Sequence, residues 1–245
     1  MNKGAILFSL ASIALLVCAG CGNFPVRSGA EPPVSPPNQI VDFNVLYAKN
    51  CAGCHGPGGK GGAAIALADP VFLAIADDAA IRRTAANGVR GTPMAAFAQS
   101  AGGMLTDKQM DALVQGIRLW AKPVTLGGAI PPSYAAQSAG DPRRGADVYR
   151  TYCSSCHGAD GSGGKAGSIV DGSYLALVSD QDLRTNVILG RPALGAPDWR
   201  GDLPGRPMSD QEISDVVAWL AAQRPAFPGQ PYPNSSTDRA TGGIR

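Results

Sequence analysis

Charged residues are scarce in this chain of 245 residues: Asp, Glu, Lys and Arg together make up only 16% of it. The formal net charge is +2, so the chain lacks the excess of basic residues on which nucleic-acid binding depends. It also lacks the composition of a highly charged disordered tail, since 44% of its residues are hydrophobic. These two classes of protein are therefore excluded.

Aromatic residues are also few, at 6% of the chain, whereas glycine and proline are abundant at 32 and 20 residues. A length of 245 residues fits one or two domains, and the shortage of aromatic side chains leaves each with a modest core. The glycine and proline content favours loops over long regular elements. We therefore expect a group other than side chains to fill part of the interior.

A hydrophobic run long enough to cross a bilayer as a helix is missing near the N-terminus. The run from Ala5 to Ala19 has about 15 residues, whereas a spanning helix needs about 20. Lys3 precedes the run, and the small pair Ala19-Gly20 ends it. This pattern predicts that residues 1–20 are a signal peptide, removed on export, rather than a membrane helix.

The end of this segment, Val17-Cys18-Ala19-Gly20-Cys21, resembles a bacterial lipoprotein signal. The resemblance implies lipidation at Cys21 and attachment to the periplasmic or another extracytoplasmic membrane face, with about 0.8 kcal/mol of binding per buried CH₂ group. Cys18 stands where that pattern usually has leucine, so ordinary cleavage and an uncleaved anchor remain alternatives. Residues 21–39 are rich in proline and predict an extended tether.

The rest of the chain contains an internal repeat with an offset of 102 residues. Without gaps, residues 47–88 and 149–190 match at 15 of 42 positions. Two copies of one domain follow, which we call the first copy (residues 40–124) and the second copy (residues 143–224). The segment between them, residues 125–142, predicts a linker, and residues 225–245 predict a loose tail.

The sequence predicts the same series of helices in both copies. A short helix precedes the cysteines, a middle helix ends at Gly88 or Gly190, and a last helix begins at a capping box, Thr106 to Gln109 or Ser209 to Glu212. Hydrophobic and polar residues nowhere alternate convincingly, so the predicted class is all-α. The last helices carry apolar faces at helical spacing: Met110, Leu113, Ile117 and Trp120, and Ile213, Val216, Val217 and Leu220.

The cysteines define the chemistry, because all four outside the signal region fall in two Cys-x-x-Cys-His motifs. Positions i and i+3 of a helical turn lie on one face, so both sulfurs reach the two vinyl groups of one porphyrin while the histidine reaches the iron. This is the attachment signature of c-type haem. The motif residues are Cys51, Cys54 and His55, and Cys153, Cys156 and His157.

Two other interpretations of these cysteines remain open. A thioredoxin-type redox pair would need a preceding strand and gives the histidine no role. A zinc site would need four ligands brought together from the two copies. Both are weaker, because the only two histidines of the chain each follow directly after a second cysteine.

With these motifs, the chain resembles a dihaem c-type cytochrome built from two class I cytochrome c domains. The resemblance implies three or more helices around a largely buried, covalently bound haem c in each copy. It also implies His55 and His157 as proximal iron ligands and a methionine on the opposite face. Met94, in the rigid Gly91-Thr92-Pro93-Met94 loop, stands where the pattern puts this ligand, whereas Met104 and Met110 are competitors.

The second copy departs from this pattern. A shift of Met94 by 102 residues leads to Ala196, which cannot bind iron. Three alternatives remain: Met208 reaches the iron through a rearranged loop, the haem has an open or water-bound position, or another group such as Lys165 binds there. Met208 could also be a hydrophobic residue that packs on the last helix.

Other repeated residues have weaker functional interpretations. Arg82 and Arg184 either pair with a haem propionate or lie on a solvated helix face, the latter being favoured. Trp120 and Trp219 are expected to be core aromatics rather than electron conduits.

The sequence therefore predicts a protein that relays single electrons through two haems between unknown redox partner proteins, in an extracytoplasmic respiratory or dehydrogenase chain. One alternative is a haem enzyme, peroxidase-like or sulfur-oxidising, that uses an open second haem. Another is a lipid-anchored subunit of a larger complex.

Overall fold

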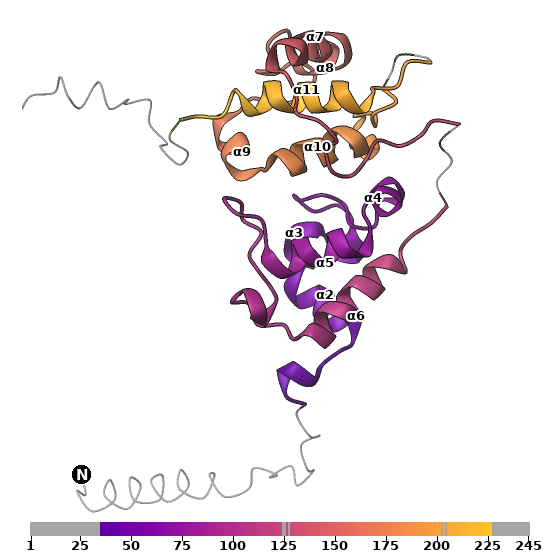
Figure 1. Cartoon of the computed structure of the whole chain (residues 1–245), viewed down its shortest axis with the longest axis vertical. Coiled ribbons are helices and arrows are strands. Elements are labelled where there is room, and N and C mark those ends of the chain that lie inside the picture. Colours follow the sequence, from indigo (N-terminus) through magenta and orange to yellow (C-terminus); the bar gives the residue numbers. More distant parts are fainter. Residues whose placement is uncertain (1–34, 124–125, 127, 202, 204, 227–245) are drawn as a thin grey trace, which may run out of the picture. The chain divides into compact units, whose positions relative to one another are not determined.

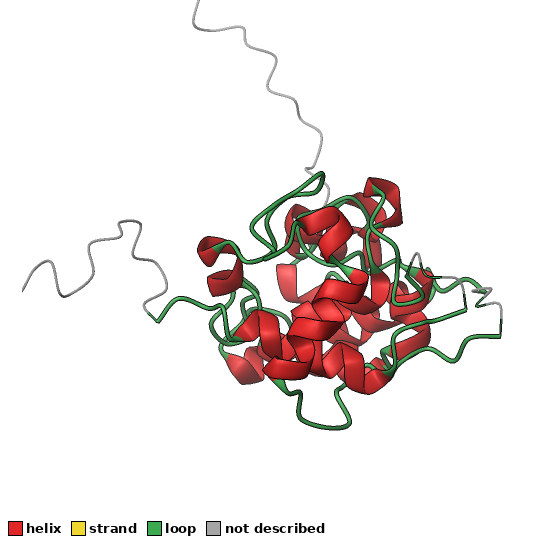
Figure 2. Ribbon diagram, turned by 90° about the horizontal axis from the view of Figure 1, so that it is seen from above, coloured by secondary structure: helices red, strands yellow, loops and turns green. Residues whose placement is uncertain are grey.

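The computed structural model describes residues 35–123, 126, 128–201, 203 and 205–226. The predicted signal peptide, Cys21 and most of the predicted tether and tail lie outside the described residues. From Pro37 onward, the described part belongs to one compact unit. Its regular elements are all helices (Figure 2). Two isolated β-bridges are present, but the described residues form no strand, which confirms the all-α class. Within the described ranges, no helix is long and apolar enough to cross a membrane.

The first copy contains five α-helices and three short 3₁₀ turns within its described residues and the tether before it (Figure 1). The α-helices are α2 (Phe43–Asn50), α3 (Ala52–His55), α4 (Pro70–Ile75), α5 (Asp78–Asn87) and α6 (Asp107–Arg118). The 3₁₀ turns are η2 (Pro37–Gln39), η3 (Pro57–Gly59) and η4 (Gln99–Ala101).

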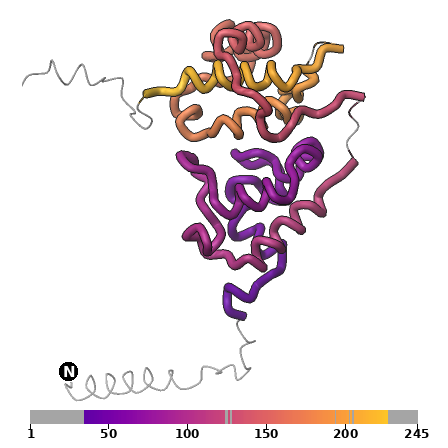
Figure 3. Tube along the Cα trace, in the orientation of Figure 1, coloured from indigo at the N-terminus to yellow at the C-terminus, as the bar shows by residue number. Residues whose placement is uncertain are grey.

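The second copy repeats this order. Its described α-helices are α7 (Pro142–Tyr152), α8 (Ser154–His157), α9 (Gly172–Leu177), α10 (Asp180–Leu189) and α11 (Asp210–Ala221), with one 3₁₀ turn, η5 (Pro192–Leu194). Figure 3 follows the chain through the first copy, from indigo to magenta, before it enters the second, from rose through orange to yellow. The helical segments are therefore not exchanged between the copies.

The local signals at the helix ends act as predicted. Thr106 accepts a hydrogen bond from the Gln109 N–H while the Gln109 side chain accepts one from the Thr106 N–H, and Ser209 and Glu212 repeat this box on α11. Each box provides partners for backbone groups that a helix end would otherwise leave unpaired. The apolar faces of α6 and α11 are buried, with Met110 and Ile213 fully enclosed.

A tryptophan at or near the end of each last helix packs against a tyrosine that is equivalent in the two copies. Trp120 meets Tyr47 edge-on with 4.9 Å between ring centroids, and Trp219 stacks on Tyr149 at 4.3 Å. Both tryptophans contact the hydrophobic core, which fits their predicted role in packing. These pairs join the first helix of each copy to the last.

An arginine near the end of each last helix holds the same turn in place. The Arg118 guanidinium donates to the Leu73 and Ala76 carbonyls at 2.5 and 2.7 Å and pairs with Asp78. Arg224 makes the corresponding three contacts at positions shifted by 102 residues, with Leu175, Val178 and Asp180. Arg224 lies three residues beyond α11, so the contact is repeated although the position of the arginine is not.

The linker is bound to the second copy through Arg184. This side chain is 3% exposed and donates to the Ser133 and Tyr134 carbonyls, and it pairs with Asp210 at the start of α11. The expectation that Arg184 lies on a solvated helix face is therefore wrong. The physical reason is that residues 133 and 134 cover this face of α10 and use its charge to satisfy their carbonyl groups.

A buried carboxylate joins α7 to α11. Asp215 is 2% exposed and accepts hydrogen bonds from the Arg144 guanidinium, the Asp141 backbone N–H and the Gln211 amide at 2.7–2.9 Å. Burial opposes its ionisation, but these hydrogen bonds outweigh burial and lower the pKa of Asp215. The ionised carboxylate therefore stabilises the folded state at neutral pH.

Asp215→Asn should lower the free energy of unfolding at pH 7 by about 1–3 kcal/mol, because it removes the negative charge and replaces one of the two acceptor oxygens with an NH₂ donor. In the wild type this contribution is fully present above the unfolded pKa of about 4 and is lost as the pH falls through the lowered folded pKa. Urea unfolding between pH 7 and pH 3 measures both effects. Asp147→Asn is the control, because Asp147 is exposed and pairs only with Arg150. Equal losses in the two variants would contradict the assignment.

Candidate haem-binding sites

The first Cys-x-x-Cys-His motif forms the turn between α2 and the loop that follows α3. Cys51 ends α2, and its carbonyl accepts the His55 N–H at 2.9 Å, which closes one helical turn. Cys51, Cys54 and His55 all line a cavity of about 1480 Å³. Two thiols and an imidazole therefore lie on the wall of one space, as covalent attachment to a porphyrin requires.

The second motif repeats this geometry. Cys153 ends α7, and its carbonyl accepts the His157 N–H at 3.0 Å. Cys153, Cys156 and His157 line the same continuous cavity. The cavity is thus bordered by both motifs, one from each copy.

Each histidine is held by a backbone carbonyl at an equivalent position. The Nδ1 atom of His55 lies 2.8 Å from the Ile65 carbonyl, and Nδ1 of His157 lies 2.8 Å from the Gly167 carbonyl. Because a carbonyl only accepts, the proton is assigned to Nδ1 and the lone pair to Nε2. This is the tautomer in which Nε2 is free to bind a metal and the ring orientation is fixed. His55 is buried, whereas His157 is partly exposed.

The first cysteine of each motif is a weak acid. Burial and then the neighbouring cysteine raise the pKa of Cys51 and of Cys153 to about 11. Thioredoxin-type redox pairs use the opposite shift, toward a reactive thiolate. The part of the chain that the structure describes brings no three His, Cys, Asp or Glu residues together as a metal site. Neither alternative interpretation of the cysteines gains support.

The glycine after each histidine is required by the turn. Gly56 has φ of 80°, and a Cβ atom built on it would lie 1.9 Å from the Lys60 carbonyl oxygen. Gly158 has φ of 83°, and its Cβ would lie 2.3 Å from the Gly163 carbonyl oxygen. The loop therefore folds back against the histidine, and no side chain fits in between.

Of the three methionines considered for the first copy, Met94 is the one on the cavity wall. Its loop is closed by hydrogen bonds from the Val89 N–H to the Met94 carbonyl and from the Thr92 hydroxyl to the Val89 carbonyl. Met104 is 81% exposed, and Met110 is enclosed in the core. Met94 therefore lies on the cavity wall, and its binding to iron stays a prediction.

In the second copy, Ala196 and both residues considered as ligands border the cavity. These two residues are Lys165 and Met208. Met208 is 6% exposed, and its N–H donates to the Trp199 carbonyl at 2.8 Å, whereas Lys165 is exposed. Met208 therefore combines burial, a fixed backbone and a place on the wall.

The propionate interpretation of the two repeated arginines has no support in the geometry. Arg82 pairs with Asp107 and Asp111, and Arg184 is committed to the linker, while neither lines the cavity. Sequence reasoning also missed two cavity-lining residues, Tyr134 of the linker and Asp182 of α10. Burial raises the pKa of Asp182, partly offset by the nearby His55. In the repeat alignment Asp182 corresponds to Ala80 of the first copy, and this difference between the copies is the signal that could have drawn attention to Asp182.

The family comparison agrees with this geometry. The model described as cytochrome C oxidase, cbb3-type, subunit III matches residues 38–115 and again residues 140–220. The chain belongs to this family of c-type cytochromes. Membership implies covalently bound haem c, and the thiols, the Nδ1-protonated histidines and the cavity beside them fit that group.

Individual relatives of this cytochrome match over part of their length. Subunit CcoP of the cbb3-type cytochrome c oxidase of Azospirillum sp. (strain B510) is 34% identical over 134 residues, which are 50% of this chain and 40% of the relative. Subunit FixP from Azorhizobium caulinodans is 29% identical over 188 residues, which are 71% of this chain and 59% of the relative. The chain thus spans about half the length of these curated relatives.

Among solved structures, a chain of the reducing HAO-like protein complex of Kuenenia stuttgartiensis superposes with a TM-score of 0.41 at 20% identity. The superposition covers 78% of this chain and 100% of the other.

Gly56→Ala should reduce the free energy of unfolding by more than about 2 kcal/mol and weaken haem retention, because it combines a strained φ with a backbone clash. Gly53→Ala, within the same motif, should match the wild type, since a Cβ there has no atom within 4 Å and the second copy has Ser155 at this position. Urea unfolding and a haem stain of a denaturing gel measure the two effects. Equal behaviour of the two variants would rule out the proposed packing of the turn.

Proposed function

We propose that this protein relays single electrons through two covalently bound haems c, one in each copy, at domains spanning residues 40–124 and 143–224. The observation that carries the proposal is the repetition of the whole site. Each copy brings two thiols, an imidazole held through Nδ1 and a methionine to one cavity. A single haem would leave the second set without a role.

Individual residues have the following proposed roles. Cys51, Cys54, Cys153 and Cys156 would attach the haems through thioethers, and the iron ligands would be His55 and Met94 in the first copy and His157 and Met208 in the second. Bound haem supplies a one-electron Fe(III)/Fe(II) couple. The Ile65 and Gly167 carbonyls orient the histidines, while the apolar wall, which includes Phe72, Ile81 and Val216, excludes water.

Electron relay is favoured over catalysis by the second copy's methionine. A haem enzyme would need an open iron position in the second site. Ala196, which corresponds to Met94, would leave that position open unless another residue bound the iron. Met208, buried and on the cavity wall, would provide a soft thioether for that position, and thioethers favour reduced iron and a higher potential. The enzyme interpretation therefore stands as the alternative that the methionine experiment below decides.

The relatives' names support a place in a respiratory complex. Two of them are described as subunits of cbb3-type cytochrome c oxidases. We propose that this chain passes electrons between redox partner proteins of such a chain, on the extracytoplasmic side of a membrane. Lipidated Cys21 and the tether of residues 21–39 would hold it there.

The holoprotein should contain two haems per chain. The pyridine haemochrome spectrum of the reduced, denatured protein, combined with measurement of the intact mass, counts them. Cys51→Ala/Cys54→Ala and Cys153→Ala/Cys156→Ala should each retain one. A wild-type count of one haem, or a count of two in either double variant, would refute the assigned attachment sites.

Met208→Ala should lower the potential of one haem only and make that iron accessible to cyanide or carbon monoxide. Redox-titrated spectra of the wild type, Met208→Ala and Met94→Ala measure this, and the two variants should affect different haems. Met104→Ala is the matched control, because Met104 is exposed. Wild-type protein in which one haem already binds cyanide at modest concentration, with no change in Met208→Ala, would favour the enzyme alternative instead.

A further inference from the structure

The linker inserts one aromatic residue against the first copy. The Tyr134 ring meets the Phe72 ring of α4 edge-on, with 6.2 Å between centroids, and its hydroxyl interacts with Thr84 of α5. Tyr134 also lines the cavity that both Cys-x-x-Cys-His motifs border. It is partly buried and belongs to neither copy of the repeat. Its contacts are therefore not part of the repeated pattern.

The backbone of the same residue is fixed to the second copy. The Tyr134 carbonyl accepts hydrogen bonds from the Gln181 amide at 2.8 Å and from the Arg184 guanidinium at 3.1 Å. The neighbouring Ser133 carbonyl accepts from Arg184 at 2.8 Å, and the Ser133 N–H donates to Asp210 at 3.1 Å. A buried cation bound to several acceptors is costly to displace, so the ring projects from a rigid base.

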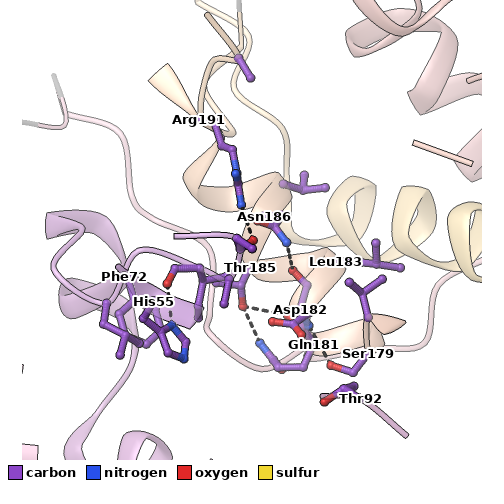
Figure 4. A pocket seen from close by; sticks show the side chains of 18 of the residues that line it. His55, Phe72, Thr92, Ser179, Gln181, Asp182, Leu183, Thr185, Asn186 and Arg191 are labelled. Atoms are coloured by element: carbon purple, nitrogen blue, oxygen red, sulfur yellow. Dashed lines mark hydrogen bonds between the residues drawn. The ribbon is translucent and has the colours of Figure 1, made fainter. Parts of the chain in front are cut away.

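Helix α10, whose Gln181 and Arg184 side chains donate to the Tyr134 carbonyl, also faces the first Cys-x-x-Cys-His motif. Figure 4 shows His55 and Phe72 of the first copy beside α10 side chains that include Gln181, Asp182 and Thr185. Asp182 is close enough to interact electrostatically with His55. Arg191, just after α10, donates to the Ala63 carbonyl at 3.0 Å. Since Leu183 and Val187 of this helix also line the cavity, α10 forms a wall shared by both sites.

We propose that Tyr134 is a positioning residue that fixes the second copy on the first, so that the two haem sites keep one mutual orientation across α10. This inference rests on the proposed two-haem function. Transfer between the sites oxidises one and reduces the other by a single electron, and no bond or proton has to move. Its rate therefore depends on how constantly the two sites are held together.

A tether alone would not achieve this. A flexible linker raises the local concentration of one site near the other but leaves their orientation to vary. Fixed geometry removes that variation, so the transfer rate keeps the value that one separation and one orientation give it. The Tyr134 ring and the Arg191 hydrogen bond supply two separate points of contact, which a rigid orientation requires.

Tyr134→Ala in the full-length holoprotein tests the inference. Electron equilibration between the haems is followed after photoreduction, and dipolar coupling between the two oxidised irons is followed by electron paramagnetic resonance. We expect the equilibration rate to fall about tenfold or more and the coupling to broaden, because the sites then sample several orientations. The haem count and the optical spectrum of each haem should stay unchanged.

Two matched variants separate the ring from other effects. Tyr134→Phe keeps the ring against Phe72 and should equilibrate within about twofold of the wild type, since it loses only a hydroxyl contact. Ile130→Ala, in the same linker but at an 88% exposed position, should have no effect. Arg191→Ala removes the second point of contact from an exposed side chain, and it should slow equilibration in the same direction.

The outcomes distinguish the inference from the function on which it rests. Fewer than two haems in the wild type would refute the proposed function itself. Two haems with unchanged equilibration and coupling in both Tyr134→Ala and Arg191→Ala would refute the positioning role alone. If Tyr134→Ala fails to retain both haems, Arg191→Ala decides, because its side chain is exposed and its loss leaves the linker intact.

Discussion

The structure depends on one backbone turn that places three side chains on the wall of the same cavity. In each copy a carbonyl of the first cysteine closes the turn onto the histidine, and a glycine with positive φ then reverses the chain. The reversal brings a carbonyl ten residues further on to the histidine Nδ1, which fixes the ring and its tautomer. The helices around the turn serve to hold it: a tyrosine of the preceding helix donates its hydroxyl proton to the carbonyl of that same glycine in both copies.

Comparison of the copies separates contacts that the fold requires from residues that happen to supply them. Arg118 and Arg224 bind equivalent carbonyls, yet they occupy different positions relative to their helices. The turn after α4 or α9 leaves two carbonyls without helical partners, and any cation that reaches them stabilises it. The methionines follow the same logic, because Met94 and Met208 come from different points of the chain and border the same cavity. A gapless repeat alignment cannot detect such replacements.

The sequence predicted those features that depend on neighbours in the chain. Capping boxes, the glycine ends of the middle helices and the Cys-x-x-Cys-His turns are local, and the structure places them where the spacing indicated. Arg184 was misjudged because its environment comes from linker residues about 50 positions away. Tyr134 was missed for the same reason: a tyrosine among prolines and alanines carries no local signal, and its partners lie in both copies. Residues whose role is set by tertiary contact need the fold before they can be interpreted.

The shared wall makes the two sites unequal although their motifs are the same. His55 is 8% exposed and has the Asp182 carboxylate of α10 nearby, whereas His157 is partly exposed. Burial and nearby charge act on a haem in opposite ways: exclusion of water disfavours the more highly charged oxidised iron, while a carboxylate stabilises it. The first site experiences both effects, and the charge comes from the second copy, to which Asp182 belongs. In the proposed two-haem protein, contact with the second copy would therefore set part of the environment of the first haem as well as its distance from the second, so that a change at the linker would reach electron transfer by two routes.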